Sequence, residues 1–126
     1  MGCDIHTLVQ VKKDNKWEDL ENDLYTDRNY KLFSILAGVR GNEDPIAYPR
    51  GFPSDFELDK DDDENHNGHY MGDHSFSYLT LTELLENKER LKEADCDFVE
   101  TLEILQDRSI GFGGMDNVRL VFGFDS

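Results

Sequence analysis

The 126-residue chain carries 13 Lys or Arg against 28 Asp or Glu, which gives a formal net charge of −15. A field of this sign repels nucleic acid and anionic membranes, so we expect neither free nucleic acid nor a membrane as a partner. The chain has no apolar run long enough to span a bilayer and no apolar secretion core near its start. Two cysteines, Cys3 and Cys96, are too few for a disulfide framework. These features predict one cytoplasmic domain over residues 1–126 with both thiols reduced.

The first part of the chain has the pattern of a β-hairpin. Strict alternation over residues 4–12 predicts a strand, and turn residues at 14–15 predict a return strand at 17–20. The polar stretch 22–27 is typical of a loop. The residues that share the apolar face of the first strand are Ile5, Thr7, Val9 and Val11.

A helix and two long connections follow. Apolar residues at helical spacing predict a helix over 30–39, with Asn29 as its N-cap. Three prolines and two glycines in 41–53 indicate an irregular but structured loop. The charge-rich segment 55–73 is interpreted as an acidic mobile loop. Its D-x-N-x-N-G run from position 63 matches half of a calcium loop, but the bidentate glutamate at the end is missing, so we expect a solvated loop instead.

The second half alternates strand and helix signals. Residues 76–81 predict a short strand, and Thr80 with Glu83 forms a capping box that starts a helix over 81–91. A second helix is predicted over 94–106 and a last strand over 118–124. The whole predicts an α+β fold: one two-layer domain with an antiparallel or mixed sheet that includes both terminal strands, and helices on one face.

Three arginines stand beside Gly, Pro or Asn in this acidic chain. Because a guanidinium binds phosphate or carboxylate through two parallel hydrogen bonds, we interpret them as an anion pocket, with tyrosines to stack on a base. The predicted ligand-binding residues are Arg28, Asn29, Tyr30, Arg40, Tyr48, Arg50, His74, Ser77 and Tyr78. The alternative is that the arginines pair with local carboxylates.

A second group of polar residues stands at predicted strand ends. Asp4 and His6 share one face of the first strand, and if the strands adjoin, His74 (or Asp73) and Asp125 converge on them. Imidazole and carboxylate suit a divalent metal, which is the one cofactor that the sequence suggests. The alternative is that these residues are satisfied polar groups at strand ends.

Several blocks of the sequence resemble an uncharacterised family of small phage and prophage proteins that begin Met-Gly-Cys-Asp-Ile-His. The resemblance spans nearly the whole chain and implies a viral context in the cytoplasm of a bacterial host, but it implies no established activity. The acidic residues 57–67 lie outside the shared pattern. The blocks that carry the resemblance are 1–6, 28–33, 37–40, 49–53, 74–80 and 118–125.

These observations lead to three functional hypotheses. The first is a binding module for a small anionic, nucleotide-like ligand, which in a phage would sequester a host defence signal. The second is a metal-dependent hydrolase of phosphoesters that uses the strand-end group. The third is an acidic inhibitor that binds a basic host protein through residues 61–63. The sequence is also compatible with a homo-oligomer whose pocket lies across a symmetric interface.

Overall fold

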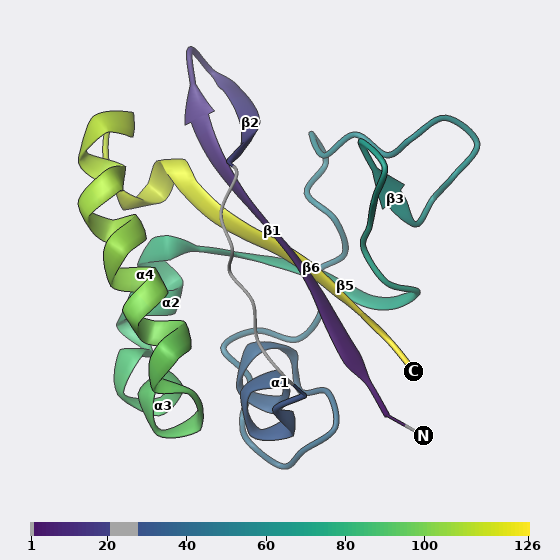
Figure 1. Ribbon diagram of the computed structural model, residues 1–126, viewed down its shortest axis with the longest axis vertical. Coiled ribbons are helices and arrows are strands. Elements are labelled where there is room, and N and C mark those ends of the chain that lie inside the picture. The colour runs from purple at the N-terminus through teal and green to yellow at the C-terminus, as the bar shows by residue number, and fades with distance from the viewer. Residues whose placement is uncertain (1, 21–27) are drawn as a thin grey trace.

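A computed structural model describes residues 2–20 and 28–126 of the protein (Figure 1). Its main sheet is antiparallel, with the strand order β2-β1-β6-β5. The two strands nearest the chain ends pair at its centre, with Asp4 opposite Asp125. The predicted α+β class and the place of both terminal strands are therefore confirmed. The strands are β1 (Asp4–Lys13), β2 (Lys16–Leu20), β5 (His74–Thr80) and β6 (Val118–Asp125).

The helices gather on one face of this sheet, as predicted (Figure 1). They are α1 (Tyr30–Ala37), α2 (Leu81–Glu86), α3 (Lys88–Ala94) and α4 (Cys96–Ser109), and the 3-10 turns η1 (Ile110–Phe112) and η2 (Met115–Asn117) lead into β6. The single helix predicted over 81–91 is wrong, because the chain turns at Asn87. The Asn87 side chain donates to the Glu83 carbonyl and its backbone leaves helical geometry, so α2 ends there and α3 begins.

The main core lies between the sheet and the helices, and it follows from the strand alternation. Val9 and Val11 of β1 are buried in it, as are Leu120, Phe122 and Phe124 of β6. These are inward residues of the two predicted strands. Burying each such side chain stabilises the fold by roughly 1.5–3 kcal/mol.

The opposite face of the sheet is covered by the connection between α1 and β5. Phe56 and Met71 from this connection are buried against Val121 of β6. Phe52 stacks between Phe56 and Phe76, with ring centroids 5.0 and 4.3 Å away. The connection also forms a small hairpin of β3 (Asn65–His66) and β4 (His69–Tyr70). The predicted mobility of 55–73 is untested, but part of this segment packs on the sheet.

A close backbone approach fixes the start of β5. A Cβ atom on Gly123 would lie 2.1 Å from the Met71 carbonyl oxygen, so only glycine allows this contact. The β5–β6 register then shifts between His74 and Ser77, and Ser75 adopts a φ of 55°. Such bulges change the direction of neighbouring side chains and are frequent beside functional sites.

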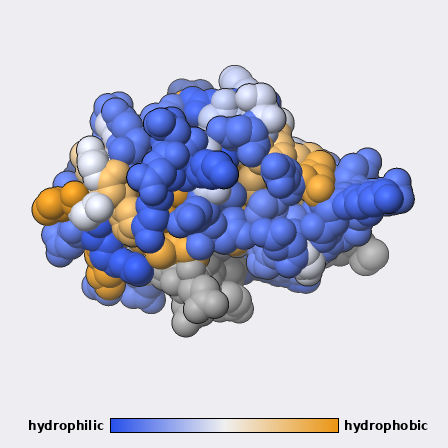
Figure 2. Space-filling view, turned by 90° about the horizontal axis from the view of Figure 1, so that it is seen from above, coloured by the Kyte–Doolittle hydropathy of each residue, from blue (hydrophilic) through white to orange (hydrophobic). Residues whose placement is uncertain are grey.

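The surface agrees with the acidic composition. Figure 2 shows a mainly hydrophilic face with small hydrophobic areas. No helix in residues 2–20 and 28–126 has the length and apolar character needed to cross a membrane. The loop predicted over 22–27 lies outside the described residues.

Candidate functional site

Polar side chains from three strands and from both ends of α1 meet at one end of the sheet. Asp4 and Asp125 are register partners, His74 pairs with Phe124, and Arg28 bonds to Asp4. The structure thus brings the predicted metal group near part of the predicted anion group. We call this the strand-end site, and its members are Asp4, His6, Arg28, Tyr30, Arg40, His74 and Asp125.

His6 and Asp125 form the shortest polar contact between side chains of the site. The His6 Nε2 atom lies 2.6 Å from the Asp125 Oδ2 atom, and the two side chains are 25% and 31% exposed. The Tyr70 ring packs edge-on against the imidazole, with centroids 4.8 Å apart, and holds its orientation. The result is an oriented imidazole–carboxylate pair that solvent or a ligand can reach, and such a pair can donate or accept a proton.

Arg28 is already paired. Its Nε and Nη2 atoms donate to the two carboxylate oxygens of Asp4 at 2.7 and 3.2 Å. The hydrogen bonds from Arg28 hold the pKa of Asp4 below its usual range. Arg28 therefore follows the alternative interpretation of the arginines, because it pairs with a local carboxylate. The pair is exposed, so it contributes little to stability, and its main effect is to neutralise both charges.

Arg40 is the cation of the strand-end site that lacks a carboxylate partner among the described residues. It follows α1 with a φ of 61°, an unfavourable backbone conformation for a side chain of this size. Its guanidinium carbon lies 5.7 Å from the Tyr30 ring centroid. Burial raises the pKa of the neighbouring Cys3 thiol, and the charge of Arg40 opposes that rise. The Cys3 backbone N–H donates to the Tyr30 hydroxyl at 3.1 Å, which ties α1 to β1.

His74 is held by two hydroxyl groups. Its Nδ1 atom lies 2.9 Å from Ser75 Oγ, and its Nε2 atom lies 3.0 Å from Ser126 Oγ. In the described part of the chain, no three His, Cys, Asp or Glu side chains are placed to hold a metal ion. Among the predicted metal residues, His6 contacts Asp125 directly, and His74 Nε2 lies 4.0 Å from Asp73 Oδ1. Asp4 is engaged by Arg28 instead.

Another part of the predicted anion pocket lies on β5 and α2. Arg50 forms a double hydrogen bond with Glu83, at 2.9 and 2.5 Å, and its Nη1 atom also donates to the Tyr78 carbonyl at 3.0 Å. The buried Ser77 hydroxyl accepts the Arg50 backbone N–H at 3.1 Å. Asn29 caps α1 and donates to the Ala94 carbonyl. These residues fasten segments to one another, and their polar groups are engaged within the fold.

The Arg50–Glu83 pair gives a testable pH dependence. Hydrogen bonds from Arg50 lower the pKa of Glu83 from 4.5 to about 2. Because the folded-state pKa is depressed, the stabilisation is complete above about pH 4.5 and is lost as pH falls toward 2. Glu83→Gln keeps the shape of the helix cap but removes the charge. We expect it to cost about 2 kcal/mol at neutral pH, since partial exposure screens the pair.

The measurement is urea unfolding of the parent and Glu83→Gln from about pH 7 to about pH 2. The difference in unfolding free energy between them is expected to shrink below about pH 4.5. A constant difference at every pH would show that Glu83 acts only as a cap.

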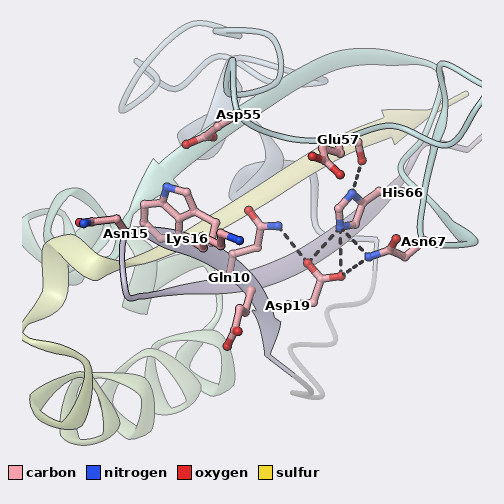
Figure 3. A pocket seen from close by; sticks show the side chains of 10 residues that line it. Gln10, Asn15, Lys16, Asp19, Asp55, Glu57, His66 and Asn67 are labelled. Carbon is pink, nitrogen blue, oxygen red and sulfur yellow. Dashed lines mark hydrogen bonds and ion pairs between the residues drawn. The ribbon is translucent and has the colours of Figure 1, made fainter.

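A groove between β2 and the 55–67 segment was not predicted from the sequence. It has a volume of about 620 Å³. Figure 3 shows Gln10, Asp19, His66 and Asn67 turned toward one another at one end, joined by hydrogen bonds. We call it the β2 groove. Its lining residues are Gln10, Asn15, Lys16, Trp17, Glu18, Asp19, Asp55, Glu57, His66 and Asn67.

The Asp19 carboxylate organises one end of this groove. It accepts hydrogen bonds from Gln10 at 2.9 Å and Asn67 at 3.1 Å, and His66 Nε2 lies 3.0 Å from both its oxygens. Burial opposes the ionisation of Asp19, but these hydrogen bonds outweigh it and lower the Asp19 pKa. The other ring nitrogen of His66 faces the Glu57 carbonyl oxygen.

Arg119 lies buried beside the groove. Its Nε atom donates to Gln10 at 2.9 Å and its Nη1 atom lies 2.9 Å from the Asp55 carboxylate. Its guanidinium carbon is 4.0 Å from the Trp17 ring centroid, so the cation lies against the indole. Among the described residues its Nη2 atom has no hydrogen-bond partner. Burial lowers the Arg119 pKa, while Asp55 opposes that shift.

Comparison of the chain with protein-family models, with curated proteins and with solved structures finds no match.

Proposed function

We propose that this protein is a binding module for a small anionic, nucleotide-like ligand, held at the strand-end site. Arg40 carries the proposal, because its guanidinium has no carboxylate partner among the described residues. Arg28 and Arg50 each form a double hydrogen bond with a carboxylate, so they do not offer their charge in the same way. Of the three predicted arginines, Arg40 is thus the one without a carboxylate partner in the described part of the chain, and its side chain hydrogen-bonds the Cys3 thiol.

An exposed aromatic ring near Arg40 supports the nucleotide-like part of the proposal. The Tyr48 ring borders Gly38, two residues before Arg40, and Tyr48 is 74% exposed. A planar base can stack on such a ring while its phosphate pairs with a guanidinium. The imidazoles of His6 and His74 add hydrogen-bonding groups at the same end of the sheet.

The biological part of the proposal is the sequestration of a host defence signal by a phage protein. It rests on the resemblance of the sequence blocks alone. Turnover of the ligand in the presence of added manganese or zinc would instead favour the phosphoester hydrolase, with His6 and Asp125 as its first candidates for ligands.

The test is a thermal-shift screen against linear, cyclic and sugar-linked nucleotides. A ligand at about 100 times its Kd adds about 2.7 kcal/mol, which raises the Tm of a chain of this size by about 10 °C. Arg40→Ala is expected to remove that shift. Arg108→Ala, which removes an exposed arginine from the far end of α4, is expected to keep it.

Three results would overturn the proposal. The first is the absence of any shift with all three nucleotide classes. The second is an equal shift for the parent and Arg40→Ala, because the ligand would then bind elsewhere. The third is loss of the shift in Arg108→Ala as well, which would show that it reflects overall charge and not this site.

A further inference from the structure

A serine hydroxyl and an imidazole touch at the start of β5. The Ser75 Oγ atom lies 2.9 Å from Nδ1 of His74, within hydrogen-bond distance. On the other side of the ring, Nε2 lies 3.0 Å from Ser126 Oγ and 4.0 Å from Asp73 Oδ1. Because a carboxylate only accepts hydrogen bonds, Asp73 favours the tautomer of His74 that carries its proton on Nε2. The Nδ1 atom then accepts the proton of the Ser75 hydroxyl.

The backbone at Ser75 has an unusual conformation. Its φ of 55° lies in the left-handed region, which residues other than glycine seldom adopt. The register of β5 on β6 shifts at this point, so that two residues, Ser75 and Phe76, face Gly123. Strained residues at bulges of this kind cluster beside functional sites. The serine nucleophile of many hydrolases likewise stands on a strained turn, which exposes its hydroxyl.

Close contacts with β6 hold this segment in place. A Cβ atom on Gly72, whose φ is 97°, would lie 2.6 Å from the Phe124 carbonyl oxygen, so the backbone approach requires glycine. The Asp73 N–H donates to the same oxygen at 2.8 Å. The His74 ring lies over the Phe124 ring, with centroids 6.2 Å apart and planes inclined by 25°. A nucleophile and a base on such a rigid segment keep their mutual geometry when a substrate arrives.

The pair is accessible to a small substrate. The His74 side chain is 39% exposed, and Ser75 is half-buried. A hydroxyl is a weak nucleophile until a base takes its proton, and a base that a third group orients is the arrangement shared by nucleophilic enzymes. The net charge of −15 repels anionic substrates from an exposed site that lacks a cation of its own. Uncharged substrates are therefore favoured.

We propose that Ser75 is a nucleophile, with His74 as its base, in the hydrolysis of small uncharged carboxylic esters. Ser75 Oγ attacks the carbonyl carbon of the ester, and its proton passes to His74 Nδ1. The bond from that carbon to the leaving oxygen breaks as His74 gives the proton to this oxygen, which leaves an acyl group on Ser75. Water then attacks the acyl-serine, and His74 transfers a water proton to Ser75 Oγ, so the products are an acid and an alcohol. The activity requires neither Arg40 nor its anionic ligand.

The experiment uses the full chain and p-nitrophenyl acetate as the probe. We expect release of nitrophenol above the rate in buffer and, after acid quenching, an acetyl group on Ser75 in the peptide mass spectrum. Ser75→Ala and His74→Gln are each expected to lower kcat/KM at least about 100-fold. Ser54→Ala is the matched control, because it removes an exposed serine from the connection between α1 and β5, and it is expected to keep the parent rate. Circular dichroism checks that each variant is folded.

Asp73 is a positioning residue in this proposal, because it acts through the tautomer of His74. Asp73→Asn is expected to lower kcat about tenfold and to leave KM unchanged, since Asp73 does not touch the substrate. An unchanged kcat would overturn its role in orienting the imidazole.

Three outcomes would overturn the proposal as a whole. The first is hydrolysis no faster than in buffer. The second is an equal rate in the parent and Ser75→Ala, which would mean that exposed imidazoles such as His69 react without a serine. The third is an acetyl group that is absent from Ser75 or that forms there equally fast in His74→Gln. Because the thermal-shift test uses nucleotides and Arg40, failure there and failure here are distinguishable.

Discussion

Gly123→Ala is expected to destabilise the folded protein by about 3 kcal/mol or more. The added Cβ atom would lie 2.1 Å from the Met71 carbonyl oxygen and 2.6 Å from Cδ1 of Phe76. The backbone oxygen cannot rotate away, and Phe76 is packed against Phe52. Relief of the clash therefore requires β6 and the segment before β5 to separate. Urea unfolding at neutral pH measures the loss.

Gly111→Ala is the matched control. A Cβ atom on Gly111 meets nothing within 4 Å, and its φ is not in the left-handed region. We expect this substitution to change the unfolding free energy by less than about 0.5 kcal/mol. If Gly123→Ala unfolded at the same urea concentration as Gly111→Ala, the close approach of Met71 to β6 would be refuted, and with it the position of His74 at the strand-end site.

The sheet and its core could be predicted because their signals are local. Alternation in β1 and β6 identifies which side chains face the helices, and the capping box of Thr80 and Glu83 places the start of α2. The break at Asn87 was not predictable in the same way. The apolar spacing continues across it, and the chain turns through one side-chain contact with the Glu83 carbonyl.

The strand-end site was predictable as a place but not as a set of contacts. Asp4, His6 and Asp125 stand at the ends of strands that any antiparallel pairing of the termini brings together. The partners of the arginines were not predictable, because 28 carboxylates compete for them. Glu83 was recognised as a helix cap, while its ion pair with Arg50 joins residues 33 positions apart.

The β2 groove was missed because its walls are distant in sequence. Asp19 and His66 are separated by 47 positions, and only the packing of the 55–67 segment on the sheet brings them together. A local signal did exist: Gln10 and Trp17 put polar and aromatic groups on the face of the hairpin opposite Val9 and Val11. The place of Arg119 within an apolar strand was a second signal, since an arginine in a buried strand is seldom without a partner.

Arg119→Ala is expected to destabilise the protein by about 3 kcal/mol, more than any other single change near the groove. The substitution leaves a cavity beneath Trp17. It also removes the hydrogen bond from Arg119 to Gln10 and the ion pair with Asp55. The change should also shift the emission of Trp17, because the indole loses the cation against its face. Urea unfolding followed by tryptophan fluorescence measures both effects in one experiment.

Arg119→Met separates the packing of this side chain from its charge. Methionine fills much of the same volume without a cation to desolvate, and one guanidinium nitrogen has no partner among the described residues. Asp55 is half exposed and returns to water when the cation is gone. We therefore expect Arg119→Met to cost less than about 1.5 kcal/mol, below the cost of Arg119→Ala. A methionine variant as unstable as the alanine variant would mean that the hydrogen bonds to Gln10 and Asp55, and not the contact with Trp17, hold the hairpin and the 55–67 segment together. The groove would then owe its shape to charge pairing and not to the packing of the side chain against the indole.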